Sequence, residues 1–500
     1  MRTQIASRCI PLLAIGIVLV ACLRHGAGLT PDTLGYLGVA GNIRTSGAVL
    51  DFLGQPFTIS PPLYPLMLAA VDKITGGNVI PALPWLDSGL FCVAIFLFGC
   101  LARRILGQSP LVPVLSLLAV VSTPLVDCAV FATTEMPYII VTLGFMILLI
   151  QYCADPKTST LTALIAVTSL APLIRYPGVT LIAAGAIILF VAPPQPLKKR
   201  LCAVLLFGAF SSVPLLLWLT RNYHVAHNLT GERATSMFSL PQTIGFAVCT
   251  VVGWFLPKRC QLLPHYTEAA TTVMALGILV LCIPGLRRRL LEQRLPQTAG
   301  ANKVGIAVVA VVFAALSAFL IITSTTTAID IIGDRLMAPV YPCFLLLLGG
   351  AGFRRPVKYA FLVLLLAVSL LKSGKVVWDS ALYGKGYAAV QWKQSALLRY
   401  VTTWPHRSQI YSNIPDVIYF RTGERAQWIP HKYVNHMTRQ RCGPPSHSLV
   451  EQMKSDFIVY YQSGTNVVYP FLYSPDELKQ WLTLKEIAVF DDGKIYQIVQ

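Results

Sequence analysis

The chain has 500 residues and a formal net charge of +18; 55% of its residues are hydrophobic, 12% are charged, and the mean hydropathy is +0.63. Soluble globular proteins carry about 25% charged residues. Half of that charge content, with apolar runs about twenty residues long, excludes a soluble enzyme, a disordered chain and a nucleic-acid-binding protein, and it predicts a polytopic helical membrane protein.

Eleven segments of the chain are long and apolar enough to cross a bilayer as helices. In chain order they are 5–23, 84–101, 108–126, 136–153, 159–174, 177–193, 201–220, 269–286, 304–323, 336–352 and 356–372. We therefore expect an all-α polytopic membrane bundle of about eleven transmembrane helices over residues 1–372.

The basic residues of the short loops indicate the orientation of this bundle, because cytoplasmic loops are enriched in Lys and Arg. With a cytoplasmic N-terminus, sixteen basic residues fall on the cytoplasmic side, against two acidic residues there, Asp155 and Glu292. The basic residues are Arg2, Arg8, Arg103, Arg104, Lys157, Lys198, Lys199, Arg200, Arg287, Arg288, Arg289, Arg294, Lys303, Arg354, Arg355 and Lys358. The positive net charge is therefore mostly a consequence of topology, and it needs no nucleic-acid partner.

Two further apolar stretches do not fit the pattern of spans. The stretch 61–72 is too short to cross a bilayer. The stretch 238–257 is long enough, but a crossing there would move Arg287–Arg289 to the outer side. We interpret 61–72 as a segment on the outer face and 238–257 as a surface helix or a re-entrant segment. The outer loops are then 24–83, 127–135, 221–268 and 324–335.

The last segment, 373–500, differs from the bundle in composition. It contains 14 basic and 10 acidic residues and no run long enough to span a membrane. β-rich pieces (SQIYS, DFIVYY and KIYQIV) alternate with helical pieces (YAAVQWKQSALLRYVTTW and SPDELKQWLT), and Asp492–Gly493 is a strong hairpin signal. We expect a small extracytoplasmic α/β domain, without an internal disulfide because Cys442 is its single cysteine.

The N-terminal segment has two interpretations. Arg2 and Arg8, an apolar core and the sequence LVAC ending at Cys22 resemble a bacterial lipoprotein signal, which would be cleaved before Cys22. The alternative is an uncleaved first span. We favour the uncleaved span because the loop that follows has the character of a segment tethered to the bundle.

Ionisable residues of both signs gather at the outer ends of the spans. Ten of the twelve acids before residue 373 are outside, although acids influence topology little. They are Asp32, Asp51, Asp72, Asp87, Asp127, Glu135, Glu232, Glu268, Asp330 and Asp334. The arginines at the same ends are Arg24, Arg44, Arg175, Arg221, Arg233 and Arg335. Singly, such residues are most often loop charges or ion pairs; as a set they indicate a site for a charged or polar ligand.

Motifs of nucleotide chemistry and of zinc or serine hydrolysis are absent from the sequence, which has no Walker loop, HExxH, GxSxG or GxGxxG context. The 12 cysteines form no CxxC pair, and most lie in apolar runs, so we expect no structural zinc or iron–sulfur site.

A set of motifs in chain order gives a more specific indication of function. TPDTLGYLGVAGNI (30–43) directly follows the first span; ISPPLYPLML (59–68), TTEMPY (133–138), LIRYPG (173–178), WLTRNYHVAHNLTGERATS (218–236) and DRLMAPVYP (334–342) come after it. In order and outer placement these motifs resemble those of the C-type glycosyltransferases, polytopic enzymes that use polyprenyl-phosphate-linked sugars. The family includes protein mannosyltransferases and lipid A aminoarabinose transferases. The resemblance covers residues 1–372.

The resemblance implies roles for two acids. The family has an acid that acts near the reacting centre in the first outer loop, and Asp32 is the matching residue. Glu135 corresponds to a second acid often seen in the family, so both are catalytic candidates. Many relatives carry two adjacent acids in the first loop, whereas Asp32 is followed by Thr33. A divalent metal stays open as a cofactor, but it has no paired-acid motif to support it.

The resemblance also implies residues that bind the donor. Arginines at outer span ends bind the donor phosphate in relatives, and the candidates here are Arg175, Arg221, Arg233 and Arg335. Arg221 and Arg335 lie in the motifs that match most closely. Tyr36 and Tyr64 are candidates for the substrate pocket. The stretches 61–72 and 238–257 either form the groove for the polyprenyl chain or pack as ordinary apolar segments.

These residue types suit sugar transfer from a lipid phosphate. Because polyprenyl phosphate leaves as a stable dianion, the enzyme must supply a base for the acceptor hydroxyl and cations for the leaving group. A carboxylate can be that base, and arginine binds phosphate oxygens bidentately and stays charged where water is scarce. We therefore expect an inverting glycosyltransferase of a bacterial inner membrane. It moves the sugar to a lipid, glycan or protein acceptor on the extracytoplasmic face, among membrane lipids.

Two other functions are compatible with parts of the sequence. A polysaccharide polymerase or ligase also has about eleven or twelve spans, outer arginines and lipid-linked glycans, but it would not require Asp32. A transporter should carry ionisable or Gly/Pro-broken spans near mid-membrane and often a repeat. Here the charges gather at the outer edge and no repeat is evident, which favours the glycosyltransferase.

Overall fold

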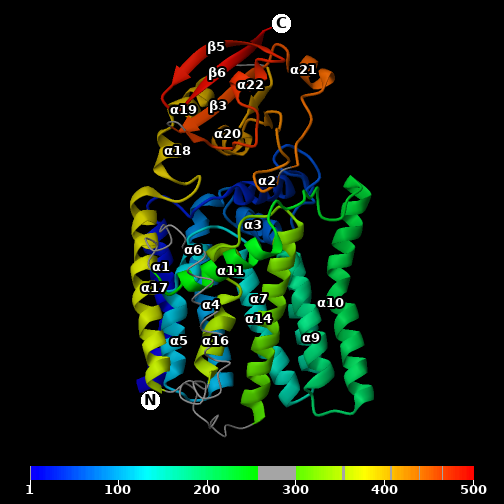
Figure 1. Cartoon of the computed structure of the whole chain (residues 1–500), viewed down its shortest axis with the longest axis vertical. Coiled ribbons are helices and arrows are strands. Elements are labelled where there is room, and N and C mark those ends of the chain that lie inside the picture. Colours follow the sequence, from blue (N-terminus) through cyan, green and yellow to red (C-terminus); the bar gives the residue numbers. More distant parts are fainter. Residues whose placement is uncertain are drawn as a thin grey trace.

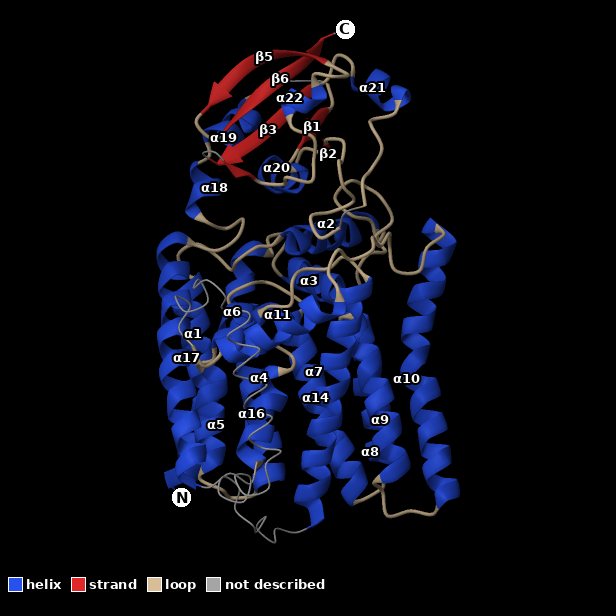
Figure 2. Cartoon of the chain, in the orientation of Figure 1, coloured by secondary structure: helices blue, strands red, loops and turns tan. Residues whose placement is uncertain are grey.

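A computed structural model describes residues 2–256, 300–351, 355–405, 408–438, 440–463 and 466–499 of the chain. A bundle of helices bears a smaller domain with a β-sheet at one end, and the N-terminus lies at the other end (Figures 1 and 2). Outside the described residues lie the predicted span 269–286 and the side chains of Glu268, Arg287, Arg288, Arg289, Glu292, Arg294 and Arg354.

The helices of the bundle follow the predicted spans. They are α1 (Arg2–Cys22), α4 (Leu83–Leu106), α5 (Leu111–Val120), α6 (Thr123–Ala129), α7 (Glu135–Ala154), α8 (Thr158–Ile174), α9 (Val179–Val191), α10 (Leu197–Ala226), α14 (Gly300–Thr326), α16 (Tyr341–Gly350) and α17 (Arg355–Tyr383). Each predicted span within the described residues coincides with one of these helices or with the pair α5–α6. The start of α10, whose first turn carries the basic residues Lys198–Arg200, lies at the same end of the bundle as the N-terminus (Figure 1).

Length and composition make this bundle a membrane domain. Five described helices are long and apolar enough to cross a membrane, or six if the bent pair α5–α6 is one span. Helices suit a bilayer because they satisfy every backbone polar group internally. In the most apolar stretch of α7, 72% of the residues are buried, against 28% in α10. The helix that begins at Glu135 is therefore central, and α10 lies at the edge of the bundle.

The predicted span 108–126 is broken in the structure. α5 ends at Val120, and α6 begins at Thr123 after a bend of 48°. Ser122 between them has an extended backbone, and Pro124 is the second residue of α6. Proline lacks an N–H and its ring clashes with the carbonyl four residues earlier, so the helix cannot continue straight through this position.

The loop predicted over 24–83 contains two helices, α2 (Pro31–Ser46) and α3 (Leu63–Ile74); α2 lies across the domain end of the bundle (Figure 1). Thr30 caps α2: its side chain accepts a hydrogen bond from the Thr33 N–H, and the Thr33 side chain accepts one from the Thr30 N–H. Pro31 at the first helical position adds its fixed φ to this start. The predicted surface segments 61–72 and 238–257 correspond to α3 and to α11 (Leu240–Gly253).

The C-terminal segment forms the predicted α/β domain. Its strands are β1 (Ile410–Ser412), β2 (Ala426–Trp428), β3 (Phe457–Ser463), β4 (Asn466–Val467), β5 (Thr483–Phe490) and β6 (Gly493–Val499). Its helices are α18 (Val390–Gln394), α19 (Ala396–Thr403), α20 (Pro415–Thr422), α21 (His447–Met453) and α22 (Pro475–Leu478). The strand order is β2-β1-β3-β6-β5, with β4 paired to β3. β1 is parallel to β2 and β3, whereas β6 pairs antiparallel with β3 and with β5. The β5–β6 pair is the hairpin predicted at Asp492–Gly493.

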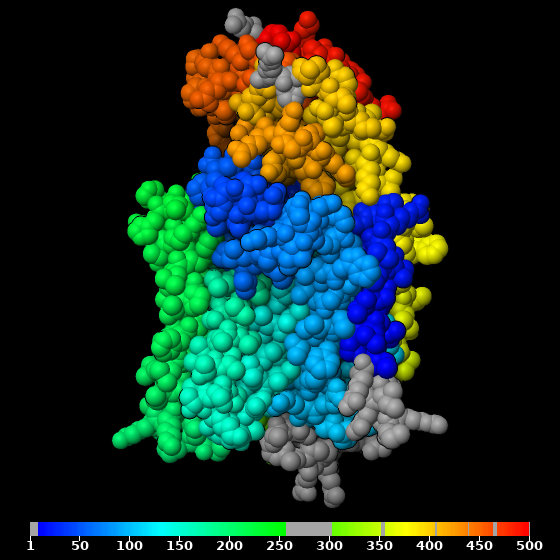
Figure 3. Space-filling model, turned by 180° about the vertical axis from the view of Figure 1, so that it is seen from behind, coloured from blue at the N-terminus to red at the C-terminus, as the bar shows by residue number. Residues whose placement is uncertain are grey.

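The first loop and the C-terminal domain share one apolar core. Leu34 and Tyr64 from the loop are buried in the same cluster as Trp392, Val417 and Ile495 from the domain. In the view from behind, the first loop forms a layer between the bundle and the C-terminal domain (Figure 3). Anything that moves the C-terminal domain therefore also moves the segment that carries Asp32.

A close backbone approach ties the two parts together after α17. Gly386 has a φ of +52°, and a Cβ at this position would lie 2.0 Å from the Leu29 carbonyl oxygen. The neighbouring Tyr387 N–H donates to that carbonyl at 2.8 Å. Glycine is required here because no side chain fits between the two segments.

Candidate functional site

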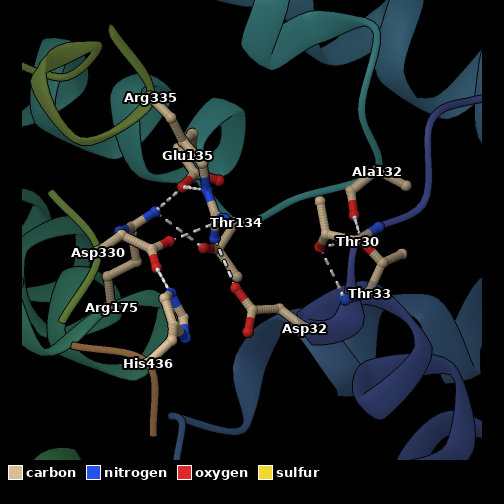
Figure 4. Close-up of polar contacts among 10 residues, drawn as sticks. All are labelled: Thr30, Asp32, Thr33, Ala132, Thr134, Glu135, Arg175, Asp330, Arg335 and His436. Atoms are coloured by element: carbon tan, nitrogen blue, oxygen red, sulfur yellow. Dashed lines mark hydrogen bonds and ion pairs between the residues drawn. The ribbon is translucent and has the colours of Figure 1, made fainter. Parts of the chain in front are cut away.

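The start of α2 is held against the loop that precedes α7. The buried Thr33 hydroxyl donates to the Ala132 carbonyl at 2.8 Å. Next to it, the Gly28 N–H donates to Val130 O at 2.8 Å and the Ala132 N–H donates to Gly28 O at 3.0 Å. These bonds place Asp32, in the first turn of α2, beside Glu135 at the start of α7 (Figure 4).

Glu135 is a fully buried acid between two arginines. Its Oε1 forms an ion pair with Arg175 Nη1 and lies 2.9 Å from Arg335 Nε. Arg175 comes from the break between α8 and the short helix η2 (Tyr176–Gly178), and its Nη1 also donates to Thr134 Oγ1 at 3.2 Å. A buried charge is tolerated only with partners of this kind, so Glu135 is the structural centre of the cluster.

Arg335, in the one-turn helix α15 (Asp334–Met337), faces three acids. Its Nε donates to Glu135, its Nη2 lies 2.5 Å from Asp32 Oδ2, and its Nη1 lies 3.8 Å from Asp330 Oδ2. Burial lowers the pKa of Arg335, but the carboxylates of Glu135 and Asp32 outweigh burial and raise that pKa overall. The guanidinium therefore stays charged.

The cluster holds more negative than positive charge. Arg175 and Arg335 stand against the carboxylates of Asp32, Glu135 and Asp330. The acids differ in access to solvent, since the side chain of Asp32 is 50% exposed and that of Glu135 is 0% exposed. Asp32 can reach a substrate, and Glu135 cannot.

A cavity of about 470 Å³ opens beside the cluster. Its charged and polar lining residues include Asp32, Tyr36, Thr134, Arg175, Arg233, Asp330 and Arg335. Its apolar lining residues include Ile174 at the end of α8 and Phe319 and Leu320 on α14. The cavity thus joins ionic groups at the domain end of the bundle to an apolar wall made by two helices of the bundle.

Arg233 lines this cavity with a different set of partners. Its Nη2 donates to the Ile59 carbonyl at 2.7 Å and its Nε donates to the Thr230 carbonyl at 3.1 Å. Within the described residues it has no carboxylate partner. Burial lowers its pKa. Arg233 is therefore a cavity cation whose charge no described acid balances.

Arg221 and Tyr64 lie away from the cavity lining. Arg221 donates to the carbonyls of Phe57 at 2.7 Å and Val49 at 3.0 Å, and its guanidinium lies over the Trp218 ring. It thereby ties the first loop to α10. Tyr64 is buried behind Tyr36, with ring centroids 5.4 Å apart, and Tyr36 is the one that lines the cavity. Of the predicted set, the structure therefore brings together Asp32, Glu135, Arg175, Arg233, Arg335 and Tyr36.

Sequence reasoning missed three residues of the site. Thr134 directly precedes Glu135 in a recognised motif and could have been included on that ground. In the sequence, Asp330 is one of ten acids on the outer side, and no motif marks it as part of the site. His436 comes from the C-terminal domain, and its Nε2 lies 3.5 Å from Asp330 Oδ1 (Figure 4). No motif in the sequence connects residue 436 with the cluster.

The acids of the cluster have arginine side chains as their partners. Among the described residues, no group of three or more His, Cys, Asp or Glu side chains is arranged to hold a metal ion. The carboxylates of Asp32 and Glu135 face guanidinium nitrogens instead.

Comparisons with known proteins give a consistent answer for the fold. No protein-family model and no curated protein sequence matches the chain. Its structure is similar to that of ArnT from Cupriavidus metallidurans bound to undecaprenyl phosphate, with a TM-score of 0.58 at 14% identity over 97% of both chains. It is also similar to the archaeal oligosaccharyltransferase AglB from Archaeoglobus fulgidus in complex with an inhibitory peptide and a dolichol-phosphate. There the TM-score is 0.52 at 12% identity, over 91% of this chain and 69% of that one. The resemblance to the C-type glycosyltransferases is thereby confirmed at the level of the fold.

Proposed function

We propose that this protein is an inverting membrane glycosyltransferase that transfers a sugar from a polyprenyl phosphate to a hydroxyl acceptor. The observation that carries the proposal is the cavity in which the half-exposed Asp32 meets Arg335 at the end of an apolar bundle. The similar structures bound to undecaprenyl phosphate and to a dolichol-phosphate support a lipid-phosphate donor.

Asp32 is the residue placed to act as general base. The acceptor oxygen attacks the anomeric carbon while the bond from that carbon to the phosphate oxygen breaks. The acceptor proton passes to the Asp32 carboxylate, and the polyprenyl phosphate departs as a dianion. A positioned base of this kind contributes about 10²–10⁴ in rate. One displacement inverts the configuration of the anomeric carbon.

Arg335 and Arg233 are the groups placed to bind the donor phosphate. Both line the cavity, and Arg233 has no described carboxylate to give up before a phosphate can bind. Arg175 is committed to Glu135 and Thr134, so its role is to keep the buried acid charged and fixed. Arg221 holds the first loop through two backbone carbonyls instead of binding the donor.

The apolar wall of the cavity suits the polyprenyl chain. Ile174, Phe319 and Leu320 continue from the ionic cluster into the bundle. The stretches 61–72 and 238–257 contribute little to this wall, since Pro61 is the residue from them that lines the cavity. We therefore place the first prenyl units between α8 and α14.

The positive-inside distribution supports a cytoplasmic N-terminus and a C-terminal domain outside the cytoplasm, in a bacterial inner membrane. The acceptor is then a lipid, glycan or protein of the cell envelope. A donor already activated by phosphate needs no nucleotide on that side.

The test uses the full chain in proteoliposomes with a panel of undecaprenyl-phosphate sugars and envelope lipid acceptors. We expect release of undecaprenyl phosphate together with a glycosylated product of inverted anomeric configuration, measured by mass spectrometry and NMR. A retained configuration would contradict the single displacement. Extension of a diphosphate-linked glycan instead would favour a polymerase, and sugar uptake without bond cleavage would favour a transporter.

A further inference from the structure

We propose that His436, supplied by the C-terminal domain, is a positioning residue for the donor phosphate. It holds Asp330 away from Arg335 and so keeps one guanidinium nitrogen available to the phosphate. This inference rests on the proposed function, because it assigns that nitrogen to the donor.

His436 lies in a segment of the domain that folds back on itself. Tyr433 and Arg441 form an antiparallel bridge, and the Cys442 N–H donates to Lys432 O at 2.8 Å. The His436 ring packs against Phe471, with centroids 6.0 Å apart. Backbone hydrogen bonds and packing against Phe471 therefore hold the His436 imidazole in place.

This segment contacts the wall of the cavity directly. Asn435 Nδ2 donates to the Ala328 carbonyl at 3.3 Å, and Ala328 and Asp330 both line the cavity. On the other side, the Met237 N–H donates to Met437 O at 3.2 Å. The C-terminal domain thus fixes the short segment that carries Asp330.

The three nitrogens of Arg335 are unequally engaged. Nε and Nη2 lie 2.9 and 2.5 Å from carboxylate oxygens of Glu135 and Asp32, so both nitrogens are engaged in charge-assisted hydrogen bonds. Nη1 lies 3.8 Å from Asp330 Oδ2, too far for a hydrogen bond. Nη1 is therefore the nitrogen best placed to receive a phosphate oxygen.

Asp330 is shared between Arg335 and His436. Its Oδ1 lies 3.5 Å from His436 Nε2, and the neighbouring imidazole, together with the charge of Arg335, lowers the pKa of Asp330. An ionised Asp330 would move onto Nη1 if nothing held its other oxygen. Loss of His436 should then convert Asp330 from a bystander into a competitor of the phosphate.

The experiment measures binding of undecaprenyl phosphate to the full chain in nanodiscs. We expect His436→Ala to weaken binding by roughly tenfold or more, the worth of one charge-assisted contact. Adding Asp330→Asn to that variant should restore binding, because the amide no longer competes for Nη1. His436→Gln keeps an N–H donor and should retain most of the affinity.

The matched control is His447→Ala, an exposed histidine of the same domain, which should bind like the wild type. A merely structural histidine would give a loss that Asp330→Asn does not repair, and that result would overturn the inference. Unchanged binding in His436→Ala would overturn it as well. If His436→Ala fails to fold, Asp330→Asn alone decides, since it must bind at least as tightly as the wild type.

Failure of the proposed function has a different signature. Wild-type protein that does not bind undecaprenyl phosphate would remove both proposals. Equal competition by inorganic phosphate would show a phosphate site that does not select the lipid. Wild-type binding with no effect of His436→Ala removes the positioning role alone.

Discussion

Asp32 and Glu135 share Arg335 but differ in access to solvent. Glu135 is fully buried and neutralises two arginines, so it organises the site without meeting the substrate. Asp32 is half-exposed and bonds only one nitrogen of Arg335 among the described contacts. With Glu135 on Nε and Asp32 on Nη2, the third nitrogen of Arg335, Nη1, is the one assigned to the phosphate.

Replacing Asp32 by Asn should therefore separate chemistry from binding. Turnover should fall by about 10²-fold or more because the base is lost. Affinity for undecaprenyl phosphate should rise, because Arg335 Nη2 no longer has an anionic partner. Turnover and dissociation constant are measured on the same preparation, with Asp155→Asn at the other end of the bundle as the control. Near-normal turnover would show that Asp32 is not the base.

Arg221→Ala should lower stability and spare the chemistry. The substitution removes two hydrogen bonds from a charged group to half-buried loop carbonyls, worth about 1.5–3 kcal/mol each. Arg335→Ala, in contrast, should abolish turnover. Thermal stability and activity per folded molecule are compared for both variants. A loss of specific activity in Arg221→Ala at full stability would return Arg221 to the phosphate site.

Motifs in the sequence located several residues of the cluster, but they did not separate residues of the cavity from residues that hold the loops. Asp32, Glu135 and Arg335 come together as the motifs implied. Arg221 stands in an equally good motif, but nothing in the sequence shows that loop carbonyls occupy its guanidinium. His436 reaches the site only because the C-terminal domain packs on the first loop, and this tertiary packing cannot be inferred from a local motif.

At the scale of elements, α2 is the part of the site that the outer-loop prediction did not resolve. Thr30 and Thr33 indicate a helix cap in the sequence. The helix itself, however, is surrounded mainly by protein and not by solvent or lipid. One side meets the bundle and the other meets the C-terminal domain. Amphipathic periodicity fails for such a helix because both faces are covered.

Thr33→Val should disturb catalysis through the position of α2. Valine keeps the shape but leaves the Ala132 carbonyl and the Thr30 N–H without their partner, at a cost of about 1–3 kcal/mol. We expect lower thermal stability and a lower turnover number, with Thr33→Ser close to wild type. Thr45→Val is the matched control, because that exposed hydroxyl bonds within α2. Normal turnover in a destabilised Thr33→Val would uncouple the cap from the site.

In the C-terminal domain, Asp416 of α20 should make stability depend on pH. Burial raises its pKa from 3.8 to about 7, although the Val417 N–H and the Tyr387 hydroxyl bond to it. The folded domain then holds a proton that the unfolded chain has released between about pH 4 and 7. Stability should fall by up to about 4 kcal/mol as pH rises through this interval.

Asp416→Asn should remove most of this dependence and stabilise the domain at pH 8. Hydrogen exchange of the β3 and β6 amides at pH 5.5 and 8 measures it in the full chain. Asp476→Asn, an exposed surface acid, serves as the control. An unchanged slope in Asp416→Asn would assign the pH dependence to other groups.

For the whole molecule, the sequence predicts the described helices of the bundle well, because lipid imposes one simple rule on every helix that it surrounds. The break between α5 and α6 and the extension of α17 to Tyr383 are local departures from that rule. Orientation is a separate prediction, and it follows from the basic residues alone. A reporter active only outside the cytoplasm should work when fused after Gln500 and fail after Arg289. Activity after Arg289 would overturn the span count and the outer site with it.

The separation of Asp32 and Arg335 by 303 positions has a consequence for how the protein is made. At about 5–20 residues per second, Arg335 leaves the ribosome about 15–60 s after Asp32. During that interval Glu135 already has Arg175 as an ion-pair partner, whereas Asp32 still lacks the arginine that it pairs with in the finished cluster. The ion pair between Asp32 and Arg335 can therefore form only after synthesis has reached α15, so the site closes late in the biogenesis of the protein.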